Sequence, residues 1–217
     1  MGLSTIILAA GQGTRMRSDL PKVLQLLAGK PLLGHVLDCA AELDADDVCV
    51  VYGHGGETVR NAFGDDGLRW TEQAEQLGTG HAVQQAMPDT PDANRVLVLF
   101  GDVPLLMPGT CRRLLEETPA DEVAVLTVDM EDPTGYGRII RDGSNVSSIV
   151  EEKDAGPDEK AVREINTGVM VCPADKLRNW LANLGNDNAQ GEYYLTDVVA
   201  MAVTDGVIVH GVKAETW

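Results

Sequence analysis

The segment of residues 8–22 combines a glycine-rich turn with several cationic side chains. A short apolar run predicts a buried strand that ends at small residues and at Gly11. Backbone N–H groups at such a turn suit an anion, and small side chains let a flat base or a pyrophosphate approach the main chain. Arg15 and Lys22 are cations within reach, and Pro21 fixes the backbone just before the lysine. The segment therefore indicates an anion-binding loop.

This loop differs from two better-known phosphate loops. It is not a Walker loop, because no Gly-Lys-Ser/Thr sequence follows the glycines. Met16 stands where a dinucleotide-binding fingerprint requires glycine. Two glycines after a strand can also form an ordinary tight turn, so that interpretation stays open at this point. The cations Arg15 and Lys22 are what favour a ligand.

Two further side chains follow predicted strands. Asp102 comes directly after the very apolar residues 95–100, so its carboxylate should emerge at the edge of a sheet. Beside phosphates, a single carboxylate suits Mg²⁺, which takes one or two carboxylates with substrate oxygens and water. A helix cap or a turn acid is the alternative. Gln73 carries an amide that both donates and accepts, as reading a nucleobase edge requires, or else it faces solvent.

Polar residues in the second half could complete a site. Glu151 and Asn166 each lie at the end of a predicted strand, where they could bind sugar hydroxyls or an amide, or form ordinary polar surface. His81 is assigned mainly to a helix surface or to the core. The other histidines have no partner pattern with serine or cysteine, so a nucleophilic triad is not indicated.

Strands and helices alternate along the first half of the chain. The pattern predicts strands at residues 5–10, 47–52, 68–71, 95–100, 122–128, 138–141, 146–150, 164–172 and 207–212. It predicts helices at residues 31–43, 57–63, 81–87, 108–118, 173–184 and 194–203. Such alternation predicts a doubly wound α/β sheet, whose ligands bind at the carboxyl ends of strands near the topological switch point. We therefore expect residues 11–22, 73–79 and 101–102 to form one site.

Composition limits the classes of function. The 217 residues include 34 acidic and 17 basic side chains, for a formal net charge of −17. An acidic chain repels nucleic acid and anionic membranes, so neither is expected as a partner. No apolar run is long enough to span a bilayer, and no export signal is recognised at the N-terminus. The four widely spaced cysteines then indicate buried thiols and a cytoplasmic location.

At this point several motifs carry a family resemblance. LAAGQGTRM at residues 8–16, with Pro21-Lys22, resembles the signature of sugar-1-phosphate nucleotidylyltransferases. Six further motifs, taken together with this one, narrow the resemblance to the uridylyltransferase domain of the bifunctional N-acetylglucosamine-1-phosphate uridylyltransferase/glucosamine-1-phosphate acetyltransferase family. The further motifs are QAEQLGTGHA (73–82), GDVPL (101–105), GYGRI (135–139), IVEEKD (149–154), INTG (165–168) and GEYYLTD (191–197). The resemblance covers essentially the whole chain.

The resemblance implies a fold and a set of site residues. The fold is a Rossmann-like, doubly wound, mostly parallel but mixed sheet of the nucleotide-diphospho-sugar transferase type. Residues 1–217 form a single nucleotidyltransferase domain, with a nucleotide-binding half (1–118) and a sugar-binding half (119–217). By resemblance, Leu8, Ala9, Ala10 and Gly11 line the nucleotide, Arg15 and Lys22 meet the phosphates, and Gln73, Gly78 and Thr79 contact the uracil and ribose. Phe100, Gly101 and Asp102 lie at the junction of the two substrates, with Asp102 on Mg²⁺. Gly137, Glu151 and Asn166 hold the sugar.

The implied reaction joins UTP and N-acetylglucosamine 1-phosphate to give UDP-N-acetylglucosamine and pyrophosphate, in bacterial cell-envelope precursor synthesis. Arg15, Lys22 and Asp102 are the expected catalytic residues, and Mg²⁺ on Asp102 is the expected cofactor. Two alternatives stay open. One is a related enzyme with another base or sugar phosphate, and the other is a module that binds a UDP-sugar without turnover.

Two departures from the family pattern bear on these expectations. Phe100 stands where the family commonly has tyrosine, so a hydroxyl beside the sugar is missing. A second Mg²⁺ ligand, an asparagine, lies in the family beyond the region that this sequence matches. The 217 residues also contain no left-handed β-helix of hexapeptide repeats, which in the family carries the acetyltransferase and builds the homotrimer. Acetyltransferase activity is therefore not expected from this chain, and its oligomeric state stays open.

Overall fold

The computed structural model describes residues 2–11, 18, 20–53, 56–65, 67–92 and 94–214. Its strands are β1 (Leu3–Ala9), β2 (Leu26–Leu27), β3 (Lys30–Pro31), β4 (Asp47–Gly53), β5 (Arg69–Gln73), β6 (Arg95–Phe100), β7 (Val123–Asp129), β8 (Arg138–Asp142), β9 (Asn145–Val150), β10 (Glu164–Pro173) and β11 (Val209–Lys213). Its α-helices are α1 (Leu32–Ala41), α2 (Glu57–Phe63), α3 (Thr79–Ala86), α4 (Pro108–Glu117), α5 (Pro157–Lys160), α6 (Ala174–Ala182) and α7 (Asp197–Thr204), and the 3-10 helices are η2 (Lys22–Leu24) and η3 (Met87–Asp89).

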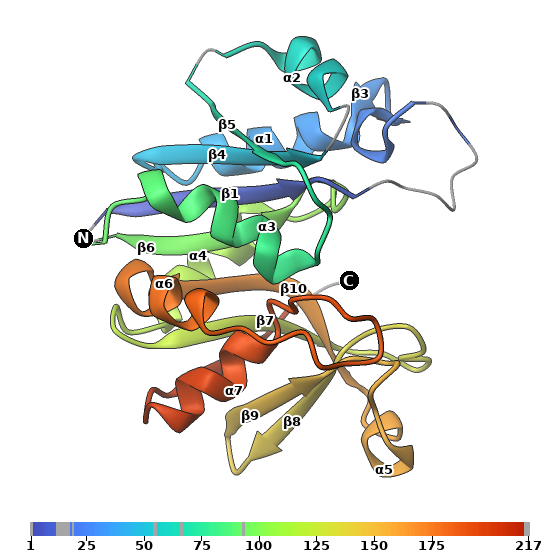
Figure 1. Cartoon of the computed structure of the whole chain (residues 1–217), viewed down its shortest axis with the longest axis vertical. Coiled ribbons are helices and arrows are strands. Elements are labelled where there is room, and N and C mark those ends of the chain that lie inside the picture. Colours follow the sequence, from blue (N-terminus) through green and yellow to red (C-terminus); the bar gives the residue numbers. More distant parts are fainter. Residues whose placement is uncertain are drawn as a thin grey trace.

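One mixed sheet runs through the molecule in the order β11-β7-β10-β6-β1-β4-β5 (Figure 1). The pairs β1–β4, β1–β6, β4–β5 and β7–β11 are parallel. Strand β10 lies antiparallel between β6 and β7, and the antiparallel hairpin β8–β9 branches from it. The predicted doubly wound, mixed α/β sheet is therefore confirmed.

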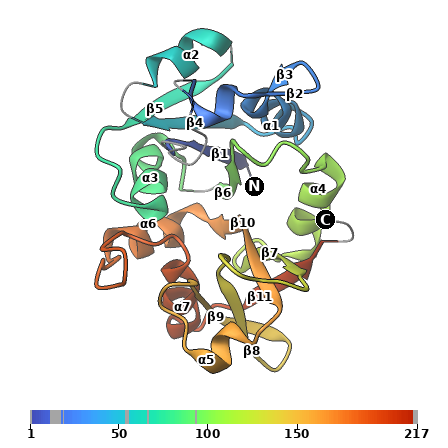
Figure 2. The same ribbon diagram turned by 90° about the vertical axis from the view of Figure 1, so that its right-hand side faces the viewer.

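Helices cover both faces of this sheet because successive residues of each strand point to opposite sides. On one face, Ile6 and Leu8 of β1 pack with helices α3, α6 and α7. On the other, Ile7 and Ala9 pack with α1, α2 and α4. Figure 2 shows α3, α6 and α7 on one side of the strands and α1 and α4 on the opposite side. This double burial explains why β1, β4 and β6 are continuous apolar runs.

The topological switch point lies between β1 and β6. From β1 the chain passes through α1 to the neighbouring β4 and through α2 to β5, and then crosses through α3 to β6 on the other side of β1. The carboxyl ends of β1 and β6 are thus adjacent, with Leu8 beside Phe100 in the register. Ligands of open α/β sheets bind at such a point.

The structure differs from the sequence expectations mainly at element ends. Helix α3 begins at Thr79, before the expected position, because Gly78 at φ +112° ends the preceding loop in a conformation that side chains disfavour. Helix α7 begins at Asp197 rather than at residue 194. The pattern did not predict α5, η2 or the β2–β3 ribbon, since elements of two to four residues carry no measurable periodicity. The proposed division at residue 118 stays a prediction.

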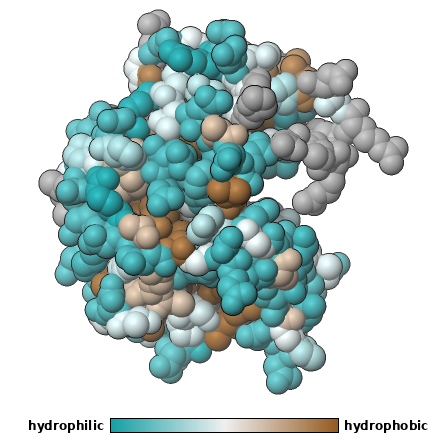
Figure 3. Space-filling view, viewed as in Figure 1, coloured by the Kyte–Doolittle hydropathy of each residue, from teal (hydrophilic) through white to brown (hydrophobic). Residues whose placement is uncertain are grey.

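The surface reflects the acidic composition. Figure 3 shows a mostly hydrophilic face, with smaller hydrophobic areas towards the middle and the lower part of the molecule. Among the residues that the structure describes, no helix is long and apolar enough to cross a membrane.

Candidate functional site

A pocket of about 510 Å³ opens at the switch point. Its floor comes from the ends of β1 and β6, and its walls come from η2, from the loop after β5 with the start of α3, and from the loop before α7. The lining residues are Leu8, Ala9, Ala10, Gly11, Lys22, Val23, Gln73, Gln76, Gly78, Thr79, Ala82, Phe100, Asp102 and Glu192. All of the residues expected at the nucleotide line it, except Arg15, which lies outside the described residues, and Gly101.

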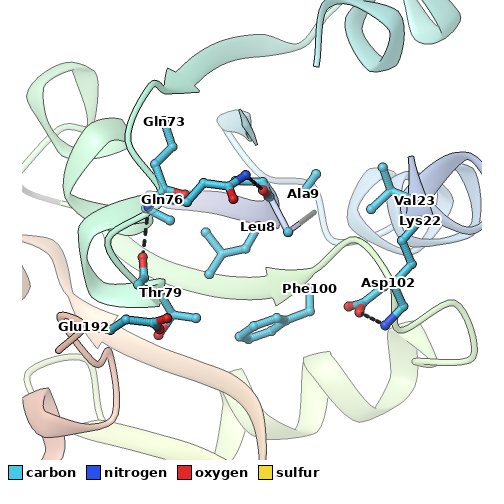
Figure 4. Close-up of a pocket in the computed structure, with 14 residues that line it drawn as sticks. Leu8, Ala9, Lys22, Val23, Gln73, Gln76, Thr79, Phe100, Asp102 and Glu192 are labelled. Carbon is cyan, nitrogen blue, oxygen red and sulfur yellow. Dashed lines mark hydrogen bonds and ion pairs between the residues drawn. The ribbon is translucent and has the colours of Figure 1, made fainter. Parts of the chain in front are cut away.

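Lys22 and Asp102 form an ion pair at one end of this pocket. Lys22 Nζ donates to Asp102 Oδ2 at 2.5 Å, and the two side chains are 39% and 30% exposed. Figure 4 shows the pair across the pocket from Gln73 and Thr79. Helix η2 positions the lysine, and the turn after β6 positions the aspartate. The site thus carries one cation and one carboxylate, both accessible from the pocket.

Gly101, directly before Asp102, lies under the floor. Its N–H donates to the carbonyl of Leu8 at 2.9 Å, which extends the β1–β6 pairing by one residue. A Cβ at Gly101 would lie 3.3 Å from Ala9 Cβ and 3.2 Å from Leu33 Cδ1. The glycine therefore allows the chain to turn close to β1, and this turn orients Asp102.

The opposite end of the pocket holds the amide groups. Gln73, at the end of β5, is only 3% exposed, and its Nε2 donates to the Gly78 carbonyl at 3.0 Å. Thr79 Oγ1 accepts a hydrogen bond from the Leu195 N–H at 3.1 Å. A Cβ at Gly78 would lie 2.6 Å from the Tyr193 carbonyl oxygen, so the loop can approach the segment before α7 only with glycine there.

Four lining residues were not anticipated from the sequence. Gln76 donates through Nε2 to the carbonyl of Ala10, so it ties the loop after β5 to the end of β1. Glu192 lies beside Thr79 in Figure 4 and brings a second carboxylate to the pocket. Val23 and Ala82 supply apolar walls. Gln76 and Glu192 belong to motifs that had been recognised, but only the tertiary fold shows which motif side chains face the pocket.

The three expected sugar residues lie together, outside the lining of this pocket. The Asn166 N–H donates to the Gly137 carbonyl at 2.8 Å. A Cβ at Gly137 would lie 3.4 Å from both carboxylate oxygens of Glu151. Strand β8 follows Gly137, β9 precedes Glu151 and β10 contains Asn166, so the hairpin and its neighbour gather residues from three parts of the chain.

Phe100 joins the two groups of residues. Its ring lines the pocket and also contacts Gly168, where an added Cβ would lie 2.5 Å from Phe100 Cε2. Gly168 has φ +89° and sits in the irregularity of β10 between residues 166 and 170. The N–H of Gly168 donates to Asn166 Oδ1 at 3.0 Å. Phe100 thus lines the pocket and also contacts the glycine whose N–H is bonded to Asn166.

An ion pair between the buried Arg138 and the partly exposed Glu152 holds the loop that contains Gly137. Arg138 is 2% exposed, and its Nη2 donates to Glu152 Oε2 at 2.7 Å. The same oxygen accepts from the Gly135 N–H at 3.2 Å, and Arg138 also donates to the Tyr136 carbonyl. Arg138 lowers the pKa of Glu152, because hydrogen bonding favours its charged form.

Glu151 occupies the opposite electrostatic situation. Burial raises its pKa, and a hydrogen bond from Thr196 Oγ1 to Glu151 Oε1, at 3.0 Å, opposes part of that rise. Asp154 and Asp197 raise it further by like charge. Burial also raises the pKa of Asp197. A carboxyl group kept from water with little compensation is typical of a ligand site.

Curated relatives match nearly the whole length of this chain. The bifunctional protein GlmU of Pseudomonas aeruginosa (strain LESB58) is 58% identical over 210 residues, which is 96% of this chain and 46% of that protein. GlmU of Dechloromonas aromatica is 55% identical over 214 residues, covering 98% of this chain and 47% of the relative. The chain thus spans about half the length of the curated relatives it matches. The family resemblance seen in the sequence motifs is confirmed.

Structural comparison gives the same fold. The crystal structure of a UDP-glucose pyrophosphorylase complexed with UDP-glucose superposes with a TM-score of 0.77 at 17% identity, covering 98% of this chain and 91% of that one. A family model described as the MobA-like NTP transferase domain matches residues 5–185. Because this match covers most of the sequence, including every pocket-lining residue except Glu192, the chain belongs to the MobA-like NTP transferase family.

Proposed function

We propose that the chain transfers the uridylyl group of UTP to N-acetylglucosamine 1-phosphate, forming UDP-N-acetylglucosamine and releasing pyrophosphate. The observation that carries the proposal is the shared wall at Phe100. Phe100 lines a pocket with an ion pair and a buried amide, and it contacts Gly168, whose N–H is bonded to Asn166 in a second group of polar residues. Two adjoining sites suit a reaction between a nucleotide and a sugar phosphate. The similarity to proteins named GlmU supports the choice of substrates.

The proposed chemistry needs positioning and charge neutralisation rather than a base. A phosphate oxygen of the sugar phosphate is already anionic, so it can attack the α-phosphorus of UTP in line without losing a proton. Lys22 would stabilise the charge that develops on the phosphates, with Arg15 proposed beside it from the sequence alone. Glu151 and Asn166 would hold the sugar, and Gln73 with Thr79 would hold the base and ribose.

We include Mg²⁺ in the proposal, with Asp102 as its protein ligand. No group of three or more His, Cys, Asp or Glu side chains among the described residues could enclose a metal. A single accessible carboxylate beside a nucleotide pocket nevertheless fits Mg²⁺, which keeps several waters and binds substrate phosphates. When bound, the ion would offset the repulsion between the reacting phosphates. A cytoplasmic location, where UTP is available, belongs to the same proposal.

The test is pyrophosphate release from UTP and N-acetylglucosamine 1-phosphate with Mg²⁺ present. We expect turnover by the wild type, and a loss of at least about a hundredfold in Asp102→Ala, the scale seen when one preorganised electrostatic group is removed. Asp38→Ala is the matched control, because Asp38 pairs with Lys30 on the surface of α1. Near wild-type turnover in Asp102→Ala would refute the metal assignment.

Two other outcomes would replace the proposal. Calorimetric binding of UDP-N-acetylglucosamine without any pyrophosphate release would identify a binding module. Faster turnover with CTP, dTTP or glucose 1-phosphate would identify a related nucleotidyltransferase with a different substrate.

A further inference from the structure

Arg138 lies where three antiparallel strands meet in register. It pairs with Val150 of β9 on one side and with Ile165 of β10 on the other. Figure 1 shows the β8–β9 hairpin at the lower end of the molecule. In antiparallel pairing, the residue before Arg138 lies beside the residues that follow Val150 and Ile165. These three neighbours are Gly137, Glu151 and Asn166.

The two faces of this junction carry different groups. On one face Gly137 lies against Glu151, since an added Cβ would be 3.4 Å from both carboxylate oxygens. On the other, Arg138 Nη2 donates to Glu152 Oε2 at 2.7 Å. The alternation follows because successive residues of a strand point to opposite faces. Arg138 is 2% exposed, so it supports the neighbouring residues from behind and is too buried to contact a bound sugar.

The Arg138–Glu152 pair fixes the backbone of residues 135–137. Arg138 donates to the carbonyl of Tyr136, and Glu152 Oε2 accepts from the N–H of Gly135 at 3.2 Å. Two of these three loop residues are glycines, which have no side chain to pack. Arg138 Nε has no hydrogen-bond partner among the described residues, so the buried guanidinium depends on these contacts. The loop and the ion pair therefore hold each other in place.

We propose that Arg138, paired with Glu152, is a positioning residue that sets the spacing of Gly137, Glu151 and Asn166 around the sugar phosphate. This inference rests on the proposed function and adds to it a residue that touches neither substrate. A guanidinium suits this role because its planar fork fixes direction as well as distance. Displacing binding groups by about 1 Å can cost a reaction up to about a hundredfold.

The test removes the pair from either side. Arg138→Met keeps an aliphatic stem without donors, and Glu152→Ala removes the acceptor. We expect each variant to raise KM for N-acetylglucosamine 1-phosphate about tenfold, the scale of one lost hydrogen bond to a charged group. KM for UTP should stay within about twofold, because Arg138 bonds no residue that lines the nucleotide pocket. Partial unfolding alone would lower kcat and leave both KM values unchanged.

Arg141→Met is the matched control. Arg141 lies on the same strand, and its Nη2 is 2.6 Å from Glu164 Oε1 at the start of β10, but it bonds nothing in residues 135–137. We expect this variant to lose stability with both KM values unchanged. An unchanged KM for the sugar phosphate in Arg138→Met would overturn the inference. An equal rise in Arg141→Met would overturn it too, because general loosening of the hairpin would then explain the effect.

A second measurement separates this inference from the proposed function. The Asn166 N–H donates to the Gly137 carbonyl, so its hydrogen exchange reports the spacing of the two strands without any substrate. Relative to the amides of β6, which report global unfolding, we expect exchange at Asn166 to accelerate at least about fivefold in Arg138→Met and to stay within about twofold in Arg141→Met.

Unchanged exchange at Asn166 in Arg138→Met would refute the inference whatever the enzyme turns over. Absence of turnover by the wild type, combined with the expected acceleration in the variant, would instead count against the proposed reaction.

Discussion

At the scale of single residues, two neighbouring carboxylates have pKa values shifted in opposite directions. Glu151 and Glu152 are adjacent in the chain, yet burial raises the pKa of the first and Arg138 lowers the pKa of the second. The difference arises because Glu151 turns towards Gly137 and Thr196, whereas Glu152 meets a guanidinium and a backbone N–H. The chain thus keeps one carboxylate largely from water and uses the next one to hold the loop.

This contrast predicts opposite effects on stability at neutral pH. A raised pKa means that the folded state binds more protons than the unfolded state. The stability that Glu151 contributes is therefore fully present below its unfolded pKa, and it is lost as the pH rises through its folded pKa. Glu151→Gln should therefore raise the melting temperature at pH 7, and the gain should disappear below pH 4.5, the ordinary value for glutamate.

Glu152→Gln is the control of opposite sign. Because the pKa of Glu152 is lowered, its charged form stabilises the fold above the unfolded pKa, and this stability is lost as the pH falls through the folded pKa. Glu152→Gln should therefore lower the melting temperature at pH 7. Thermal unfolding of both variants from pH 4 to 8 measures the effect. Changes of the same sign in the two variants would contradict the electrostatic assignment.

At the scale of elements, the irregular strand β10 decides how the two parts of the site meet. The register shift between Asn166 and Met170 lets Gly168 adopt φ +89° and gives the ring of Phe100 room against the backbone. A regular strand would direct a side chain into the space that the ring occupies. The irregularity therefore sets both the position of Asn166 and the wall of the pocket.

Gly168→Ala tests this account. A methyl group would lie 2.5 Å from Phe100 Cε2, and the left-handed backbone alone costs about 1–2 kcal/mol with a side chain. We expect a loss of unfolding free energy of about 2 kcal/mol or more and a raised KM for the sugar phosphate, because displacing the ring disturbs the neighbourhood of Asn166.

Gly109→Ala is the matched control in denaturant unfolding. Gly109 lies in helix α4, and an added Cβ there meets nothing within 4 Å. Alanine in a helix should be neutral or stabilise by up to about 1 kcal/mol. A Gly168→Ala protein as stable as wild type, with unchanged KM, would show that the ring contact is not needed.

At the scale of the whole molecule, charge is the dominant feature. A net charge of −17 on 217 residues opposes the compact state by self-repulsion and also repels an anionic substrate. The ion pair of Lys22 places a cation inside the pocket. Because Asp102 pairs with this cation and Glu192 adds a second carboxylate, the described lining residues together carry no net positive charge.

Salt should therefore stabilise the fold. We expect the melting temperature to rise by about 2–4 °C between 10 mM and 500 mM NaCl, as the Debye length falls from about 30 Å to about 4 Å and repulsion is screened. Thermal unfolding monitored by circular dichroism measures this, with sorbitol of equal osmolality as the uncharged control. A melting temperature that falls with NaCl would mean that attractive ion pairs outweigh the net repulsion.

Much of the architecture was predictable because short segments of the sequence determine it. Mostly apolar stretches in β1, β4 and β6 predict buried strands. The Asp142–Gly143 pair predicts the β8–β9 turn, where Gly143 has φ +61°. Alternation of strand and helix then predicts the α/β sheet. The sheet in turn predicts that the ligand-binding loops meet at the carboxyl ends of its strands. Ten of the expected nucleotide-site residues line the pocket for that reason.

Contacts between distant segments were decided by the tertiary structure. Lys22 and Asp102 are 80 residues apart, and the contact of Phe100 with Gly168 depends on β10 lying antiparallel beside β6. Even the bond from Gln73 to His81, only eight residues on, needs the Gly78 turn to point both side chains the same way. The sequence by itself determined which residues could bind a nucleotide, since local periodicity and turn chemistry are properties of short segments. Strand order and burial determined which of them meet, because those depend on the packing of the whole chain.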